Sequence, residues 1–144
     1  MPNIEEYHDF GIIQQKKIKP ILENIFGELI EFEDRYSKFD YMNDKFNIEL
    51  KSRINVKITT FSKTLLALNK IKECEGKELI FVFNFVCNGL NEIYYIKYDK
   101  KVFELFDTEL VEYFDGTNKL HYLIPSPLLT LLHKDKPKCL LKVR

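Results

Sequence analysis

The segment Phe46-Asn47-Ile48-Glu49-Leu50-Lys51-Ser52-Arg53-Ile54-Asn55-Val56-Lys57-Ile58 carries the clearest pattern in the chain. Every even position in it is apolar except Ser52, and every odd position is polar or charged. Side chains alternate between the two faces of a β-strand, so this period of two predicts a strand with one buried face. The fold is therefore expected to be organised around this strand.

A short segment at 39–42 precedes the strand, and a polar interruption separates the two. Asn43 and Asp44 both tolerate a positive φ, which predicts a two-residue turn between two antiparallel strands. A turn at these two residues pairs Asp40 with Asn47. One extra loop residue would turn Asp40 to the opposite face, so the functional interpretation depends on this register.

The predicted hairpin brings together three side chains that could bind a metal or take part in catalysis. Asp40, Glu49 and Lys51 project to one side, and the two acids are diagonal neighbours about 5–8 Å apart at Cβ. Two carboxylates this close repel each other unless a cation lies between them. Mg²⁺ takes only one or two protein carboxylates and completes its shell with water and phosphate oxygens. Lys51 would then orient the attacking water or offset charge on the phosphorus.

A surface explanation of the same residues stays open. An exposed strand face often alternates Glu, Lys and Arg simply because opposite charges pair across neighbouring strands. Glu33 and Asp34, which come just before the hairpin, have the same two interpretations, as additional metal ligands or as solvated loop residues.

Asp40 and Glu49-Leu50-Lys51 resemble the PD-(D/E)XK nuclease superfamily, whose core is a helix, three strands that carry these residues, a second helix and a further strand. The run from Ile48 to Arg53, with Asn69-Lys70 after it, looks like small members of the superfamily that large DNA viruses encode. The resemblance spans about residues 11–86.

The resemblance implies an α/β fold in which helices flank a central mixed β-sheet. It places a restriction-endonuclease-like αβββαβ core at about 9–87, followed by additional strands and a short helix over 88–144, in a single domain of 1–144. The chain departs from the superfamily pattern at two positions. Phe39 stands where the name-giving proline would be, and Gln15 stands where the first helix usually offers a glutamate.

The function that the resemblance implies is metal-dependent hydrolysis of DNA phosphodiester bonds. Asp40 and Glu49 would hold Mg²⁺, for which Mn²⁺ is a substitute, and Lys51 and Gln15 would complete the catalytic group. A neutral amide at Gln15 cannot replace a carboxylate charge. The alternative is therefore a catalytically weakened nuclease fold that binds nucleic acid or serves as a structural protein of a virus particle.

Four further residues are candidates for nucleic-acid contacts. Arg53 follows the predicted catalytic group on the same strand. Thr60, Lys63 and Lys70 belong to a helix predicted from Thr59 to about Glu75, whose first turn would offer free backbone N–H groups to a phosphate. The usual position for lysines on a helix is the solvent-facing side, which is the alternative for Lys63 and Lys70.

Composition sets outer bounds on these expectations. The chain has 144 residues, of which 45% are hydrophobic, so it is long and apolar enough for one domain with a real core. Lys+Arg and Asp+Glu both total 22, so the overall charge does not itself favour nucleic-acid binding. Cys74, Cys87 and Cys139 lack metal-site spacing and are interpreted as thiols in a reducing compartment.

Location and partners follow from similar arguments. The chain starts without the apolar segment of a secretory signal, and no segment has the roughly 18 apolar residues of a membrane helix. We therefore expect an intracellular protein that is not secreted, or, for a viral protein, one in the host cytoplasm or the virion. DNA is the expected partner, and a homodimer is a further expectation because homodimers are common in such folds.

The remaining elements are predicted from local patterns. A helix begins at Phe10 with Asp9 as its cap, is kinked or split by Pro20, and ends at Gly27. The others are a first strand at 28–33, a strand buried on both faces at 79–86, a hairpin turn at Asn88-Gly89, strands at 93–98, 102–106 and 121–124, a loop at 115–118 and a short helix at 128–132.

Overall fold

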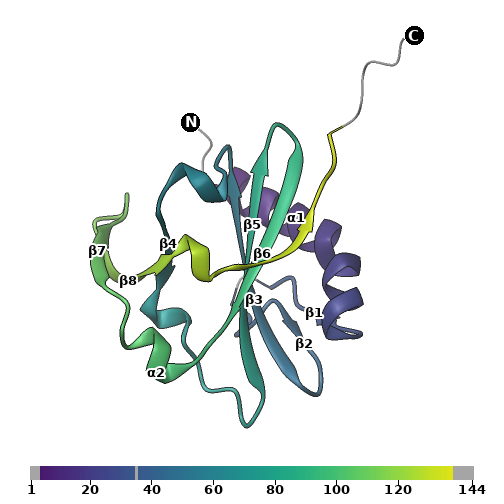
Figure 1. The fold of residues 1–144 in the computed structure, drawn as a ribbon, viewed down its shortest axis with the longest axis horizontal. Coiled ribbons are helices and arrows are strands. Elements are labelled where there is room, and N and C mark those ends of the chain that lie inside the picture. Colours follow the sequence, from purple (N-terminus) through teal and green to yellow (C-terminus); the bar gives the residue numbers. More distant parts are fainter. Residues whose placement is uncertain (1–3, 35, 138–144) are drawn as a thin grey trace.

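The structure of the chain, a computed structural model, describes residues 4–34 and 36–137. These residues form three layers, namely a long helix, a six-stranded mixed sheet and a three-stranded antiparallel sheet (Figure 1). The α/β class and the central mixed sheet predicted from the sequence are confirmed. The long helix flanks one face of the sheet as expected, whereas the other face packs against the second sheet and one short helix, Lys100–Phe103.

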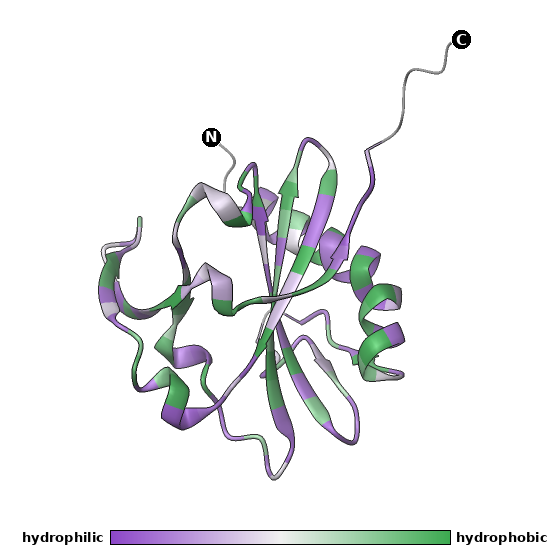
Figure 2. Cartoon of the chain, in the orientation of Figure 1, coloured by the Kyte–Doolittle hydropathy of each residue, from purple (hydrophilic) through white to green (hydrophobic). Residues whose placement is uncertain are grey.

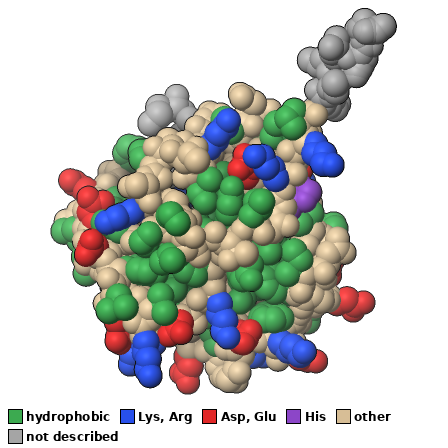
Figure 3. Space-filling view, in the orientation of Figure 1, with side chains coloured by type: hydrophobic (Ala, Val, Ile, Leu, Met, Phe, Trp, Pro, Cys, Tyr) green, Lys and Arg blue, Asp and Glu red, His purple; other side chains and the backbone are tan. Residues whose placement is uncertain are grey.

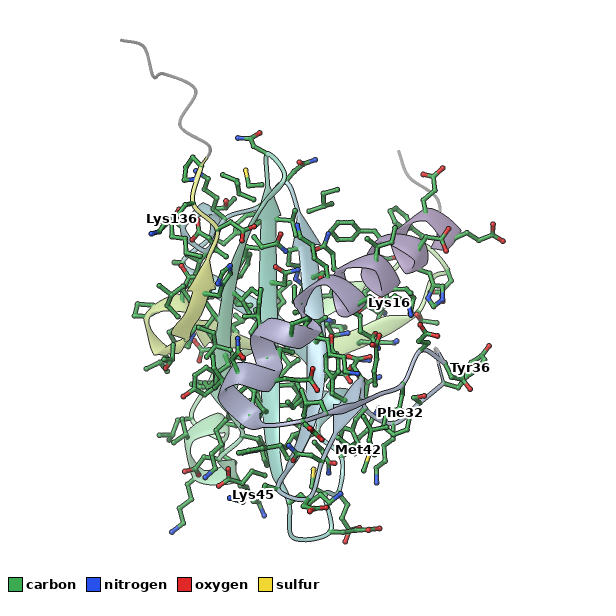
Figure 4. All side chains as sticks on the ribbon, turned by 90° about the vertical axis from the view of Figure 1, so that its right-hand side faces the viewer. Lys16, Phe32, Tyr36, Met42, Lys45 and Lys136 are labelled. Carbon is green, nitrogen blue, oxygen red and sulfur yellow. The ribbon has the colours of Figure 1, made fainter. Side chains whose placement is uncertain are left out.

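Helix α1 (Ile4–Phe26) covers one face of the central sheet. Ile18, Leu22 and Phe26 repeat at a spacing of four residues and are buried, so they form the apolar stripe that packs on the strands. Hydrophobic and hydrophilic residues accordingly alternate along the turns of α1 (Figure 2). The helix lies across the front of the strands when the molecule is turned by 90° (Figure 4).

The boundaries of α1 correct one prediction and confirm another. The helix begins at Ile4 and not at Phe10, because the acidic residues Glu5 and Glu6 suit the positive N-terminal end of a helix. Pro20 lies within the helix without dividing it into two. Gly27 ends it as predicted, with a φ of 88° that favours glycine.

The central sheet has the strand order β1-β2-β3-β5-β6-β9. Strands β1 (Ile30–Glu31), β2 (Tyr41–Met42) and β3 (Phe46–Ile54) are antiparallel neighbours. Strand β5 (Glu78–Cys87) is parallel to β3, and β6 (Leu90–Lys97) and β9 (Thr130–Lys134) continue the sheet antiparallel. The predicted first strand at 28–33 is thus only two residues long.

Strand β5 forms the centre of the core, as its nearly continuous apolar sequence predicts. Its side chains alternate between two hydrophobic clusters. Ile80 and Val82 pack with α1, whereas Phe81, Phe83 and Phe85 face the second sheet. The hairpin from β5 to β6 turns at Asn88 and Gly89, whose φ values of 54° and 76° match the predicted turn.

The second sheet replaces the helix predicted from Thr59 to Glu75, and that prediction is wrong. This segment forms a 3₁₀ turn η1 (Ile58–Thr60), strand β4 (Lys63–Ala67) and a second 3₁₀ turn η2 (Leu68–Lys70). Strand β4 pairs with β8 (Asn118–Pro125), which pairs with β7 (Thr108–Glu112). Short apolar runs suit either a helix or a strand, and here the distant β8 supplies the hydrogen bonds of a strand.

The C-terminal half contains two further corrections. The predicted strand at 102–106 begins instead as helix α2 (Lys100–Phe103), because the Asp99 side chain caps it by accepting a hydrogen bond from the backbone N–H of Lys101. The predicted helix at 128–132 is a 3₁₀ turn η3 (Ser126–Leu128) followed by β9, which pairs with the otherwise open edge of β6. The strand predicted at 121–124 lies within β8 and is therefore not the last one.

A buried network of amides lies between α1 and the central sheet, and the sequence pattern did not reveal it. Asn91 Nδ2 donates to Gln14 Oε1 and to Asn84 Oδ1, both at 2.8 Å. Lys17 Nζ donates to Asn91 Oδ1 at 2.7 Å. These bonds satisfy polar groups on α1, β5 and β6 that would otherwise be costly to bury, so the network fixes how α1 docks on the sheet.

The surface bears on the expected partners. Hydrophobic side chains gather in the middle of the face shown in Figure 3, while lysines and acidic residues lie mostly around its rim. Leu128 and Leu131 are among the exposed hydrophobic residues of the chain. The homodimer and the DNA partner stay predictions. Within the described ranges, no helix has the length and apolar character needed to cross a membrane.

Candidate functional site

The open edge of β3 carries a polar pocket of about 220 Å³. The antiparallel partner β2 pairs only with the first part of β3, so the edge beyond Ile48 is left for side chains. All four residues of the predicted catalytic group line this pocket, namely Gln15, Asp40, Glu49 and Lys51. Lys70, one of the predicted nucleic-acid contacts, lines it too. These residues come from α1, the residue before β2, β3 and η2.

The turn of the hairpin differs from the predicted one by one residue. Asn43 N–H donates to the Phe46 carbonyl at 3.0 Å, so Asp44 and Lys45 form the turn. Met42 consequently pairs with Asn47, a shift of two residues from the predicted register. A shift by two keeps each side chain on its own face, and the predicted carboxylates therefore still meet.

The side chain of Asp40 supplies the hydrogen-bond acceptor that β3 lacks beyond its pairing with β2. Its Oδ2 accepts a hydrogen bond of 2.7 Å from the backbone N–H of Leu50, and no other hydrogen bond within the described residues reaches this carboxylate. Burial, and then the charge of Glu49, raise the pKa of Asp40 to about 6 from 3.8, although Lys51 and Lys70 oppose the shift. The two acids are therefore close enough to repel each other.

Glu49 lies between two lysines. Its Oε1 is 3.0 Å from Nζ of Lys70 and 3.9 Å from Nζ of Lys51. Burial, and then the charge of Lys70, lower the pKa of Lys51 to about 8. Burial lowers the pKa of Lys70 too, but its charge and hydrogen-bond interactions with Glu49 outweigh this and the net shift is upward. Lys70 is thus the main cation that Glu49 holds.

Gln15 is buried and holds the backbone around Asp40. Its Nε2 donates to the Phe32 carbonyl at 2.6 Å and lies 3.5 Å from the Asp40 carbonyl. The Tyr41 hydroxyl in turn donates to the backbone carbonyl of Gln15. Figure 4 labels Phe32, which lies directly after β1 on the connection to β2. Gln15 therefore positions the segment that carries Asp40, as well as lining the pocket.

The other predicted nucleic-acid contacts do not line this pocket. Arg53 lies farther along β3, where Nη2 donates to the Leu65 carbonyl at 2.9 Å. Thr60 lies in η1, and its Oγ1 accepts a hydrogen bond from the N–H of Lys57. Lys63 pairs with Asp107 at 3.4 Å. The helix predicted to carry Lys63 and Lys70 does not exist, because that segment is a strand followed by a 3₁₀ turn.

Two acids from the loop before the hairpin also reach the pocket. Glu33 and Asp34 both line it, and both are exposed. Glu33 forms an ion pair with Lys16 of α1, which Figure 4 labels beside this loop. The acidic run in the sequence was the signal for these residues, whereas nothing in the sequence indicated that Lys70 would pair with Glu49.

The donor set can be compared with what a divalent metal requires. In residues 4–34 and 36–137 no cluster of three or more His, Cys, Asp or Glu side chains could hold a metal ion. Mg²⁺ is compatible with a smaller set, because one or two carboxylates suffice when water and phosphate complete the shell. The repulsion between Asp40 and Glu49 is the feature that a cation would relieve. The two carboxylates therefore fit such an ion, in competition with Lys70 for Glu49.

Comparisons of the chain with known protein families, with curated proteins and with solved structures found no match. The interpretation of the pocket therefore rests on the residues of this chain alone.

Proposed function

We propose that the protein is a metal-dependent nuclease that hydrolyses DNA phosphodiester bonds, with Asp40, Glu49 and Lys51 as its catalytic residues and Gln15 as a positioning residue. The observation that carries this proposal is a polar pocket in which two mutually repelling carboxylates lie beside two lysines. Buried groups with perturbed pKa values gathered in a pocket are typical of catalytic sites.

The order of the elements supports a restriction-endonuclease-like core. Helix α1 is followed by the antiparallel strands β1, β2 and β3, and β5 then lies parallel to β3. The chain departs from the superfamily in the connection between β3 and β5, where β4 replaces the second helix. The resemblance accordingly depends on the first part of the core and on the residues of the pocket.

The roles of the side chains follow from their positions. Asp40 and Glu49 would hold Mg²⁺ or Mn²⁺, which when bound supplies a more acidic water and neutralises phosphate charge. Lys51 lies partly buried beside them, so its ammonium is placed to stabilise charge that develops on the phosphoryl oxygens. Lys70 is placed to move from Glu49 to a phosphate oxygen when a substrate enters. Gln15 keeps Asp40 in place through its backbone contacts.

A second candidate is a nucleic-acid-binding or virion structural protein that has kept the pocket without cleavage. Two observations favour it. The neutral Gln15 adds no charge to the pocket, and its amide is already used to hold the backbone. Lys70 already neutralises Glu49, so a metal must displace this ion pair in order to bind both acids.

Cleavage of plasmid DNA distinguishes the two candidates. The purified chain, Asp40→Asn and Lys51→Ala are incubated with Mg²⁺, with Mn²⁺ or with a chelator. The nuclease proposal requires metal-dependent nicking by the wild type that both substitutions abolish. Equal traces of cleavage from all three proteins would indicate contamination and contradict the proposal. DNA binding without any cleavage would support the second candidate.

A further inference from the structure

A second polar pocket, of about 190 Å³, lies between the two sheets and shares Lys51 and Lys70 with the carboxylate pocket. Its other charged walls are Arg53 from β3 and Lys119 from β8. No acidic residue lines it among those that the structure describes. The chain as a whole has no net charge, so this concentration of four cations is a local feature that favours an anion.

Arg53 is the central donor of this second pocket. Its guanidinium has five N–H donors, and within the described residues only the bond to the Leu65 carbonyl is present, with no carboxylate at ion-pair distance. The strand alternation of β3 turns Arg53 to the same face as Lys51, toward the second sheet. A largely buried guanidinium without an anionic partner is costly, and planar oxyanions match its geometry.

Lys119 is held near Arg53 by its neighbours on the second sheet. Its Nζ lies 5.0 Å from the centre of the Tyr113 ring. The Tyr113 hydroxyl is 2.9 Å from His121 Nε2, while His121 Nδ1 is 3.0 Å from the Lys119 carbonyl. Because that carbonyl can only accept, Nδ1 carries a proton. These contacts link the two sides of the turn between β7 and β8 and place Lys119 at the wall of the pocket.

We propose that this second pocket, lined by Lys51, Arg53, Lys70, Lys119, Tyr113 and His121, is a binding site for a phosphoryl group. The inference rests on the proposed function for the identity of the substrate, since a nucleic-acid strand carries a phosphate on every nucleotide. The two pockets share Lys51 and Lys70, so we assign one phosphate of a strand to the carboxylate pocket and its neighbour to Arg53 and Lys119. The pocket has room for several water molecules at about 30 Å³ each, and hence for a phosphoryl group.

The position of Lys51 agrees with this assignment. Lys51, Arg53 and Lys70 line the same pocket without a carboxylate among its walls, and an anion between them would relieve the repulsion between their charges. The shared wall also explains how one substrate engages both pockets. A phosphate in the second pocket draws Lys51 and Lys70 away from Glu49, which frees this carboxylate for a cation.

Binding is measured in the full chain with a chelator present, so that no cleavage takes place. Inorganic phosphate and a short single-stranded oligodeoxynucleotide are titrated by calorimetry against the wild type, Arg53→Gln and Lys119→Gln. Lys100→Gln is the matched control, since Lys100 is exposed, pairs with Glu104 just after α2 and lines neither pocket. Lys119 is itself exposed, so its substitution leaves the fold intact.

We expect phosphate to bind the wild type and Lys100→Gln equally, and Lys119→Gln and Arg53→Gln at least about fivefold more weakly. If the oligonucleotide binds more tightly than phosphate, and both variants lose the same affinity for it, the site is assigned to nucleic acid. If only phosphate binds, the site is assigned to a free anion. Absence of phosphate binding, or equal binding by all variants, would overturn the proposal. Phosphate binding without metal-dependent cleavage would leave this site standing while the nuclease proposal fails.

Discussion

Nζ of Lys70 lies 3.0 Å from Oε1 of Glu49, in a pocket that Asp40 also lines. A lysine thus holds one of the two carboxylates that a divalent ion would need. Lys70 and a divalent ion would consequently compete for Glu49.

Removal of the competing ammonium is expected to strengthen metal binding. Lys70→Gln leaves Glu49 without its closest cation, so Mg²⁺ or Mn²⁺ should stabilise this variant more than the wild type when melting temperature is followed against metal concentration. Lys63→Gln is the control, because Lys63 pairs with Asp107 outside the pocket. A metal response that is identical in the two variants and the wild type would argue against a metal site at Glu49.

Asp40→Asn is expected to stabilise the metal-free protein while abolishing cleavage. The folded protein raises the pKa of Asp40 from 3.8 to about 6, so it binds more protons than the unfolded chain in this window and loses stability as pH rises through it. The penalty is fully present above about pH 6. An asparagine avoids it and can still accept the hydrogen bond from Leu50.

Urea unfolding with a chelator present measures this effect. At pH 8 the free energy of unfolding should be higher in Asp40→Asn by about 1–3 kcal/mol, and the gain should shrink at pH 5. Asp44→Asn, in the exposed turn, should show no such pH-dependent gain. A gain that is the same at both pH values would mean that the ionisation of Asp40 is not the cause.

Lys51 is expected to act through its positive charge. Lys51→Arg keeps a cation beside Glu49, whereas Lys51→Met keeps the apolar stem and removes the charge. We expect Lys51→Met to lose about 100-fold or more in the rate of DNA cleavage, and Lys51→Arg to keep a measurable part of it. Circular dichroism checks that both variants fold. Equal rates in the two variants would exclude the electrostatic role.

Gln15→Glu tests whether the usual superfamily carboxylate can be restored. The new side chain loses the N–H donor that binds the Phe32 carbonyl and adds a buried charge near Asp40, so we expect a loss of about 2–4 kcal/mol in metal-free unfolding. Mn²⁺ should recover part of this loss because the pocket then has one more ligand. Gln15→Met lacks the charge, and its melting temperature should not recover with metal.

The amide network under α1 is expected to contribute strongly to stability without affecting the pocket. Asn91→Ala removes the donor to Asn84 Oδ1 and the acceptor of Lys17, which should cost about 2–3 kcal/mol in urea unfolding. Asn118→Ala, at an exposed position, should change stability by no more than about 0.5 kcal/mol. Metal response should be equal in the two variants, and a selective loss in Asn91→Ala would connect the network to the site.

Local periodicity in the sequence was enough to predict several parts of this protein. Alternation along β3 placed Glu49, Lys51 and Arg53 on one face, and the continuous apolar run of β5 identified the centre of the sheet. The even register shift at the hairpin left Asp40 on the predicted side, so the error in the turn did no harm to the site. Asp99 also carried a helix signal that capping rules could have detected.

Contacts between distant parts of the chain determine the secondary structure of the short apolar segments and the residues that meet in the two pockets. Residues 63–67 suit a helix or a strand, and pairing with β8 decided for the strand. The ion pair of Lys70 with Glu49 and the meeting of Arg53 with Lys119 depend on how the chain crosses from β3 to β5. Local pattern specifies which face a side chain occupies, whereas the partner across that face depends on the packing of segments far apart in the sequence.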